Sequence, residues 1–234
     1  MYKRVLLKLS GEALANNGKE TFDNSIIDKI VKQIKLITQE GVQVSLVIGG
    51  GNFWRGRSAN PAMDRCRADQ IGMLATVMNA IYVADFLKQN GLKSAVMTPF
   101  SLGSMTEMFS KDAALEYLSE NKIIIFAGGI GHPFFSTDTV TALRASELQA
   151  DAILYAKSID GVYNDDPAKN PNAVKYETIR CKEIIEKNLK VIDIAAANLC
   201  YEQAIPVVIF GLSEENGIVK AAMGEKIGTL VTAD

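Results

Sequence analysis

The chain alternates short apolar runs with longer segments in which apolar residues recur at helical spacing. The short runs lie at 4–10, 42–48, 93–98, 122–127, 152–156 and 206–210. This alternation is typical of βαβ units, in which helices cover a mostly parallel sheet. The pattern therefore predicts an α/β fold.

Three of the longer segments predict helices. The first lies between the first two strands and is expected to end near Gly41, which suits a C-terminal cap. Its apolar stripe consists of Ile26, Ile27, Ile30, Val31, Ile34 and Ile37. Further helices are predicted over about 67–90, ending at Gly91, and over about 138–149. The segment 165–177, rich in Pro, Asn and Asp, predicts a surface loop.

Composition is that of an ordinary folded protein, with 234 residues, 48% hydrophobic and 22% charged. No linker or repeat divides it, so residues 1–234 are expected to form a single domain. The net charge of −2 gives no overall positive field for a nucleic acid partner. No apolar run has the length of a signal-peptide core or a membrane span, so a cytoplasmic location without membrane attachment is expected.

The three cysteines, Cys66, Cys181 and Cys200, are far apart and show no CxxC spacing. An odd number without paired spacing argues against a disulfide framework or a zinc site. Reduced thiols are the simpler interpretation.

Several predicted strands end in small, polar or glycine-rich turns, at 8–11, 49–56, 128–138 and 157–167. In open parallel sheets, ligands bind outside the carboxyl ends of the strands. These turns are therefore expected to converge. The sequence has neither a GxxxxGK[ST] loop nor a GxGxxG fingerprint, so a bound nucleotide would have its phosphates held in another way.

The first glycine-rich turn has three successive residues without a Cβ, at 49–51, which lets main-chain N–H groups approach a phosphate. Arg55 and Arg57 follow and could supply forked donors to phosphate oxygens. A tight structural turn is the alternative. Arg65 and Arg67 are interpreted as solvated charges at a helix start.

In the second glycine-rich turn, Ser136, Thr137 and Asp138 stand at the start of a predicted helix, where N–H groups can bind an anion. Thr137 or Asp138 acting as a helix cap is an equally open interpretation. His132 is the only histidine; with aromatic neighbours and a proline, it is expected to be a wall residue rather than a general base.

Lys8 interrupts an otherwise apolar strand. An ammonium group in a central strand is costly unless it meets a counter-ion, which favours a position facing phosphates near the strand end. The alternative is an edge strand with Lys8 in water.

The chain resembles the bacterial UMP kinases of the amino acid kinase family over nearly its whole length. The resemblance rests on RVLLKLSGEAL at 4–14, VIGGGNFWRG at 47–56, IGMLATVMNA at 71–80, HPFFSTDTVTALRASELQAD at 132–151, IDGVYNDDP at 159–167 and MGEKIGTLV at 223–231. It implies a three-layer α/β/α sandwich with a mostly parallel central sheet. It also implies transfer of the γ-phosphoryl group of ATP to UMP, with Mg²⁺ carried by ATP.

The resemblance also implies roles for individual residues. ATP is expected to contact Lys8, Leu9, Ser10, Gly11, Gly51, Arg55, Tyr163 and Asp166. UMP is expected to contact Gly50, Arg55, Asp69, Ile130, Gly131, His132, Pro133, Phe134, Phe135, Ser136 and Thr137. Lys8, Asp138 and Asp193 are the expected catalytic residues, with Asp193 orienting the lysine. Asp69 would bind the ribose, although an acidic residue that simply begins the 67–90 helix is the alternative.

Three features depart from the family pattern. Lys157 stands where family members usually have Thr or Asn, and His132 stands where they usually have Asn. The segment 16–24 lacks a glycine-rich stretch that is seen in relatives activated by GTP. Family members suggest a homohexamer, and the apolar helix 71–87 is a candidate interface, although a core helix would look the same. Two other functions remain open: a kinase acting on a carboxylate or carbamate, and a uridine-nucleotide sensor without turnover.

Overall fold

The computed structural model describes residues 1–15, 20–55, 60 and 62–233. Arg57 and part of the 16–24 segment lie outside the described residues. The strands are β1 (Arg4–Leu9), β2 (Gln43–Ile48), β3 (Ser94–Thr98), β4 (Glu107–Met108), β5 (Ile123–Phe126), β6 (Ala152–Lys157), β7 (Val162–Tyr163), β8 (Lys175–Tyr176), β9 (Thr178–Arg180), β10 (Val207–Gly211) and β11 (Thr229–Thr232). The helices are α1 (Asn24–Gln39), α2 (Arg65–Gln89), α3 (Lys111–Ser119), α4 (Thr137–Glu147), α5 (Cys181–Glu186), α6 (Ile194–Glu202) and α7 (Gly217–Met223), with a short 3₁₀ turn η1 (Gly11–Leu14).

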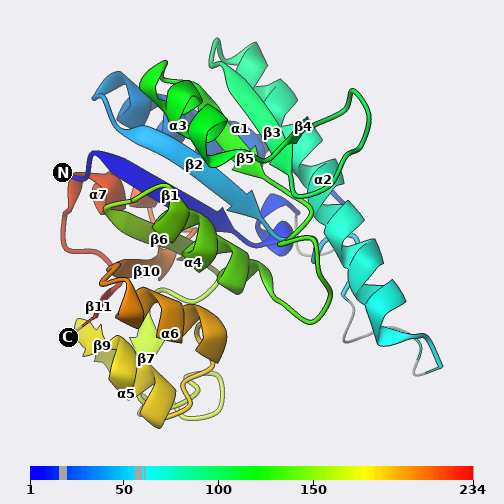
Figure 1. Cartoon of the computed structure of the whole chain (residues 1–234). Helices are drawn as coiled ribbons and strands as arrows, with labels where there is room; N and C mark the ends of the chain where they lie inside the picture. The colour runs from blue at the N-terminus through cyan, green and yellow to red at the C-terminus, as the bar shows by residue number, and fades with distance from the viewer. Residues whose placement is uncertain (16–19, 56–59, 61, 234) are drawn as a thin grey trace.

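Nine strands form one sheet in the order β4-β3-β5-β2-β1-β6-β10-β11-β9 (Figure 1). All neighbouring pairs are parallel except β10 and β11, which are antiparallel. Strands β7 and β8 pair separately as a small antiparallel hairpin. The mostly parallel sheet confirms the α/β fold that the apolar runs predict.

Helices cover both faces of the sheet. One core contains side chains of α1, α2 and α7 packed on β-strand residues such as Leu7 and Leu9. The other contains side chains of α3, α4, α5 and α6 packed on the opposite face, which carries Leu6. The alternation of Leu6 and Leu7 between the two cores follows from the two-residue period of a strand. The architecture is therefore the expected three-layer α/β/α sandwich.

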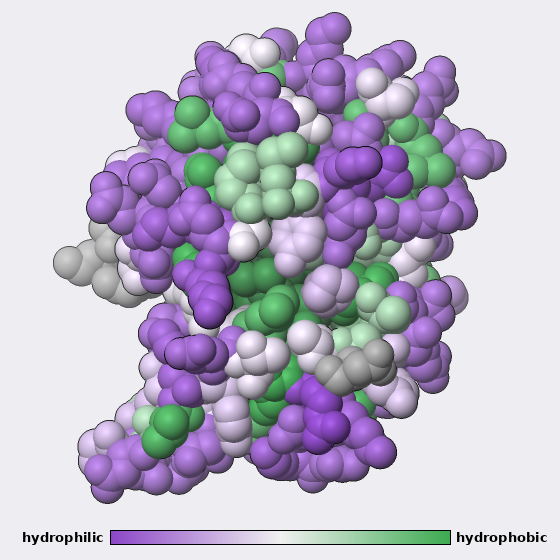
Figure 2. All heavy atoms as spheres, turned by 90° about the vertical axis from the view of Figure 1, so that its left-hand side faces the viewer, coloured by the Kyte–Doolittle hydropathy of each residue, from purple (hydrophilic) through white to green (hydrophobic). Residues whose placement is uncertain are grey.

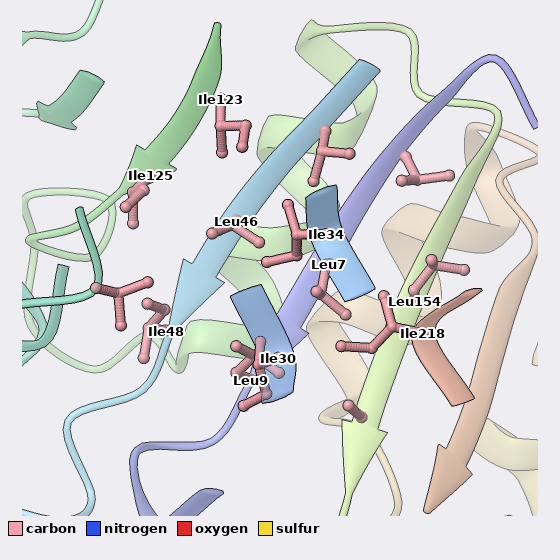
Figure 3. Close-up of a cluster of buried hydrophobic side chains, with 14 of the residues drawn as sticks. Leu7, Leu9, Ile30, Ile34, Leu46, Ile48, Ile123, Ile125, Leu154 and Ile218 are labelled. Atoms are coloured by element: carbon pink, nitrogen blue, oxygen red, sulfur yellow. The ribbon is translucent and has the colours of Figure 1, made fainter. Parts of the chain in front are cut away.

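Helix α1 shows how the sequence specifies these layers. Asp23 caps it by accepting hydrogen bonds from the main-chain N–H groups of Ser25 and Ile26, at 2.9 and 3.2 Å. Gly41 follows its end at φ +84°, a left-handed conformation that glycine adopts without strain. The predicted apolar stripe packs on the sheet, and Figure 3 shows Ile30 and Ile34 over the strand side chains. Full burial of such a side chain contributes about 1.5–3 kcal/mol.

The predicted strands and the three predicted helices are confirmed with small shifts of their ends. The helix expected at 67–90 begins at Arg65, and the helix expected at 138–149 spans Thr137–Glu147. The 165–177 segment is largely exposed, as expected, but its last part forms β8 and returns along β7.

Helix α2 is the longest helix described. By length and composition alone it could cross a membrane, although a helix packed on the core of a soluble protein passes the same test. Its inner face is buried in the core with Val77, Ala80, Val83 and Leu87. Figure 2 shows the side of the molecule at the left of Figure 1, where hydrophilic residues cover most of the surface around a central band of hydrophobic ones.

Candidate active site

Four adjacent parallel strands, β5, β2, β1 and β6, end at one edge of the sheet. The turns that follow them carry the sequence features predicted for phosphate binding. They begin at Ser10, Gly49, Ala127 and Ser158. Their convergence is the predicted arrangement, because the carboxyl ends of parallel strands lie on the same side.

Lys8 lies in β1, between β2 and β6, and is 8% exposed. The alternative of an edge strand with Lys8 in water is therefore wrong. Its Nζ atom lies 2.9 Å from Oδ1 of Asp138. A buried ammonium group is tolerated here because a carboxylate provides its counter-ion.

Asp138 lies in the first turn of α4 and contacts two lysines. Its Oδ2 atom is 3.9 Å from Nζ of Lys157, at the end of β6. Burial opposes ionisation of Asp138, but the charges of Lys8 and Lys157, together with hydrogen bonds from Lys8 and from the main chain of Asp193, outweigh it, so the pKa of Asp138 is lowered. The carboxylate is therefore ionised at neutral pH.

Lys157 is the member of this group that the sequence did not reveal. It lies largely buried beside Asp138 and donates a hydrogen bond to the Val191 carbonyl. Burial lowers the pKa of Lys157 below its usual value, and the Asp138 carboxylate only partly offsets this effect. The available signal was a lysine at the end of an apolar strand, the same signal that identified Lys8.

Asp193 caps α6 by accepting the Ala196 N–H at 2.7 Å. Its carboxylate also accepts hydrogen bonds from the hydroxyl groups of Ser136 and Thr139, the latter at 3.0 Å. Asp193 thus joins the start of α6 to the start of α4, and its main chain also hydrogen-bonds the Asp138 carboxylate. Ser136 is the cap of α4, so the alternative that Thr137 or Asp138 caps this helix is wrong.

Tyr155 packs against the charged group formed by Lys8, Lys157 and Asp138. It is fully buried, and its hydroxyl donates to the Asp138 carbonyl at 3.3 Å. Its ring centroid lies 5.7 Å from the Lys8 Nζ atom and 5.2 Å from that of Lys157. Both ammonium groups are therefore within the range of a cation–π interaction with one ring.

The turns after β1 and β2 interlock. A Cβ on Gly11 would lie 2.5 Å from the main-chain nitrogen of Gly51, and a Cβ on Gly51 would collide with the Glu12 carboxylate. Gly50 packs as closely on α2, where a Cβ would lie 2.8 Å from that of Ala75. At Gly11 and Gly50 a side chain would meet main-chain atoms that cannot move freely, whereas at Gly51 it would displace the flexible Glu12 side chain. Glycine is therefore a structural requirement of these turns at positions 11 and 50.

The other predicted residues of these turns have distinct environments. Leu9 points into the core, and Ser10 caps η1 by accepting the Ala13 N–H at 3.2 Å. Arg55 is exposed and forms an ion pair with Glu12. Only the main chain of Leu9 can therefore face a ligand, whereas the Arg55 guanidinium is accessible to one.

Asp69 connects α2 to the turn after β5. Its carboxylate pairs with the Arg65 Nε atom at 2.9 Å and accepts the Phe134 N–H at 2.9 Å. The helix begins at Arg65 with Asp64 as its cap, so the alternative that Asp69 simply begins the helix is wrong. Arg65 is not merely solvated either, because it forms this ion pair.

The turn after β5 runs from Ala127 to Ser136 in an irregular conformation. Gly131 has φ +87° and Phe134 has φ +73°, which is unusual for a residue other than glycine. Ile130 and Pro133 are half-buried, while His132, Phe134 and Phe135 are exposed. The exposed aromatic rings are available to a ligand.

Tyr163 and Asp166, predicted on the adenine side, belong to the β7 region. The Tyr163 hydroxyl donates to Asp160 at 2.8 Å, and Asp166 is exposed beside Lys169. Neither lines the open cleft of about 1460 Å³ that adjoins the converging turns. Its lining includes Lys8, Ser10, Gly51, Arg55 and Lys157 from the converging turns.

Within the described ranges, no group of three or more His, Cys, Asp or Glu side chains could hold a metal ion. Asp138 is paired with lysines, and Asp193 with hydroxyl and N–H donors. The donor set therefore fits a metal that arrives with phosphate oxygens better than one held by protein ligands alone.

Comparisons with known proteins agree with this geometry. Residues 3–211 match the amino acid kinase family. A uridylate kinase of Streptococcus thermophilus is 48% identical over 99% of this chain and 95% of its own. The structure of UMP kinase from Bacillus anthracis superposes with a TM-score of 0.96 at 36% identity, covering 100% of this chain and 97% of that one.

A UMP kinase structure from Ureaplasma parvum gives a TM-score of 0.93 at 34% identity, covering 99% of each chain. The similarity over the whole chain to these kinases, in sequence and in fold, identifies it as a phosphotransferase. This chain belongs to the amino acid kinase family.

Proposed function

We propose that this protein is an enzyme that transfers the γ-phosphoryl group of ATP to UMP, forming ADP and UDP in pyrimidine nucleotide biosynthesis. The observation that carries the proposal is the buried Lys8–Asp138 ion pair, 2.9 Å long, where the glycine-rich turns converge. The Streptococcus thermophilus relative named uridylate kinase, identical at 48% of aligned positions, supports UMP as the acceptor.

The acceptor needs no strong base. The second pKa of a phosphate monoester is about 6, so UMP is already largely a dianion near pH 7. Catalysis then consists of aligning two anionic groups and screening their charge. Lys8 and Lys157 screen the phosphates, while Asp138 holds both ammonium groups in place. Asp193 keeps Asp138 and the start of α4 in position.

Mg²⁺ carried by ATP would neutralise part of the phosphate charge. Asp138, which pairs with both lysines, and Asp193, whose main chain hydrogen-bonds Asp138, would orient the lysines or a water carried with the metal. Their existing partners leave the phosphates as the main ligands of the ion.

The donor nucleotide occupies the cleft beside the 8–11 turn and Gly51. Main-chain N–H groups of these turns hold its phosphates, as successive amides in such turns do. Tyr163 and Asp166 lie outside the lining of that cleft, so their proposed contact with the adenine rests on the family resemblance alone. The exposed Arg55 is accessible from the phosphates of both nucleotides.

UMP lies on the other side of the centre. Gly50 and Arg55 hold its phosphate, Asp69 accepts a hydrogen bond from the ribose, and residues 130–137 surround the base. The hydrogen bond from the Phe134 N–H to Asp69, at 2.9 Å, supports this arrangement because it places the proposed ribose ligand next to the loop proposed to surround the base.

The protein consists of a single domain and acts in the cytoplasm. It assembles as a homo-oligomer, which the family resemblance suggests is a hexamer. Four large apolar side chains on α2 support self-association because they are exposed at 38–48% along one stripe: Ile71, Leu74, Met78 and Ile81. Sedimentation of the Leu74→Lys/Met78→Lys variant should show smaller particles than the native chain. Identical sedimentation would place the contacts elsewhere.

A coupled ADP-release assay with UMP, CMP, dUMP, aspartate, glutamate and carbamate tests the activity. UMP should be the preferred acceptor, and Lys8→Ala should abolish transfer far more than it weakens UMP binding. Turnover with a carboxylate or carbamate would identify a different kinase of this family. UMP binding without any ADP release would indicate a sensor.

A further inference from the structure

Asn79 is a polar residue fully buried in α2. Its Nδ2 atom donates to the Gly49 carbonyl at 2.6 Å and to Oδ1 of Asn52 at 2.8 Å. Asn52 returns a hydrogen bond from its own Nδ2 to Oδ1 of Asn79 at 3.0 Å. The two side chains thus form a reciprocal amide pair between the helix and the glycine-rich turn after β2.

The pair uses nearly all of its hydrogen-bonding capacity inside the protein. Asn52 also donates to the Thr21 carbonyl at 3.0 Å, so the pair reaches the segment before α1 as well. An apolar residue would fill a buried helix position without any need for partners. An asparagine at position 79 is therefore best explained by the groups it holds.

The amide pair lies where the two phosphate turns touch. A Cβ on Gly11 would lie 2.6 Å from Oδ1 of Asn52 and 2.7 Å from the Gly49 carbonyl. Both of these atoms are contacted by Asn79. A shift of Asn52 or Gly49 would consequently move the 49–52 turn against the 8–11 turn.

We propose that Asn79 is a positioning residue that, through Asn52 and Gly49, sets the separation between the 8–11 and 49–52 turns. The inference rests on the proposed function, in which these turns hold the donor and acceptor phosphates. Phosphoryl transfer depends on the separation and alignment of those groups. Asn79 therefore controls turnover without touching either nucleotide.

The test compares Asn79→Leu with Val83→Ala, a control one turn along the same buried face of α2. Leucine keeps the volume but leaves the Gly49 carbonyl and the Asn52 amide without their partner. With both substrates saturating, kcat should fall on the order of 100-fold, more than either KM changes. Val83→Ala should lose stability through its cavity but keep kcat within about twofold.

A double-mutant cycle separates positioning from general packing. Asn52→Ala should also lower kcat, and adding Asn79→Leu to it should cause a smaller further loss than Asn79→Leu causes alone, because both changes break the amide pair and only the Gly49 contact remains to be lost. Additive losses, or a kcat for Asn79→Leu equal to that of Val83→Ala, would overturn the proposal. If Asn79→Leu does not fold, Asn79→Ala replaces it, with a smaller expected loss because water can enter.

Hydrogen exchange distinguishes failure of this inference from failure of the proposed function. Amides in 47–55 should exchange faster in the Asn79 variant than in Val83→Ala, whether or not the native chain uses UMP. Unchanged exchange would overturn the positioning role. If the native chain releases no ADP in response to UMP but the variants still show this difference in exchange, the proposed acceptor is wrong and the positioning role stands.

Discussion

Replacing Asp138 with asparagine tests the charged centre because it keeps the shape of the side chain and removes one charge. Lys8 and Lys157 would remain as two largely buried ammonium groups, with side chains only 10% and 18% exposed, and without their shared carboxylate. Removing one partner of a buried ion pair costs about 3–5 kcal/mol. For a domain of this size, each 1 kcal/mol lowers Tm by about 2–4 °C, so a fall of roughly 6–20 °C is expected.

Thermal unfolding followed by circular dichroism measures this loss, and Asp28→Asn provides the control. Asp28 pairs with Lys32 on the exposed surface of α1, where such a pair contributes about 0.3–0.5 kcal/mol. MgATP should restore part of the lost stability in Asp138→Asn because phosphate oxygens give the lysines new partners. Equal Tm changes in the two variants would refute the assignment of Asp138 as the buried counter-ion.

The pH dependence provides a second test of the same carboxylate. Because the folded protein lowers the pKa of Asp138, the carboxylate contributes stability above its ordinary pKa of about 3.9. That contribution is lost as the pH falls through the lower folded pKa. The difference in unfolding free energy between the native chain and Asp138→Asn should be constant near pH 7 and shrink in acid. Urea denaturation of both proteins from neutral to acidic pH measures it, and a difference that grows in acid would contradict the sign.

Three further substitutions test the neighbouring roles. Lys157→Met should keep or raise Tm, because burial lowers the pKa of Lys157 and so disfavours its charged form. The same variant should have a lower kcat. A kcat equal to that of the native chain would exclude a role of Lys157 in phosphoryl transfer. Arg55→Lys keeps the charge but loses the planar fork, so steady-state kinetics should show a higher KM for UMP and little change for ATP, whereas equal losses would place Arg55 between the two sites. Asp69→Asn should narrow the preference for UMP over dUMP, because only UMP has the 2′-hydroxyl that can donate to the Asp69 carboxylate, and a hydrogen bond to a charged group contributes about 1.5–3 kcal/mol. An unchanged UMP/dUMP ratio would reject the ribose contact.

The alternation of apolar runs predicts most of the sheet because its strands are buried on both faces and need no distant information. The short helices α3, α5, α6 and α7, of six to nine residues, were not predicted. Helices of this length depend on tertiary packing, so local pattern marks them weakly. The 3₁₀ turn after β1 was missed for the same reason.

Lys8 and Lys157 show the same limit within the site. Both are lysines at the ends of apolar strands, yet only the first was assigned a role, because the second departs from the family pattern. Pairing of β1 with β6 brings both to one carboxylate. Likewise, nothing local to the sequence marks Asn79 as a partner of Asn52, because burial and partner are both tertiary properties.

The sequence by itself determined the six central strands and the three longest helices, and which glycine, lysine and aspartate residues lie at their ends. Those features depend on periodicity and residue type within a few positions. Only the tertiary structure decided that β5, β2, β1 and β6 are neighbours, that Lys8 pairs with an aspartate far along the chain, and that α2 supports the turns between them. Parallel pairing joins segments distant in sequence, and an ion pair depends on distance in space, so neither leaves a local signal.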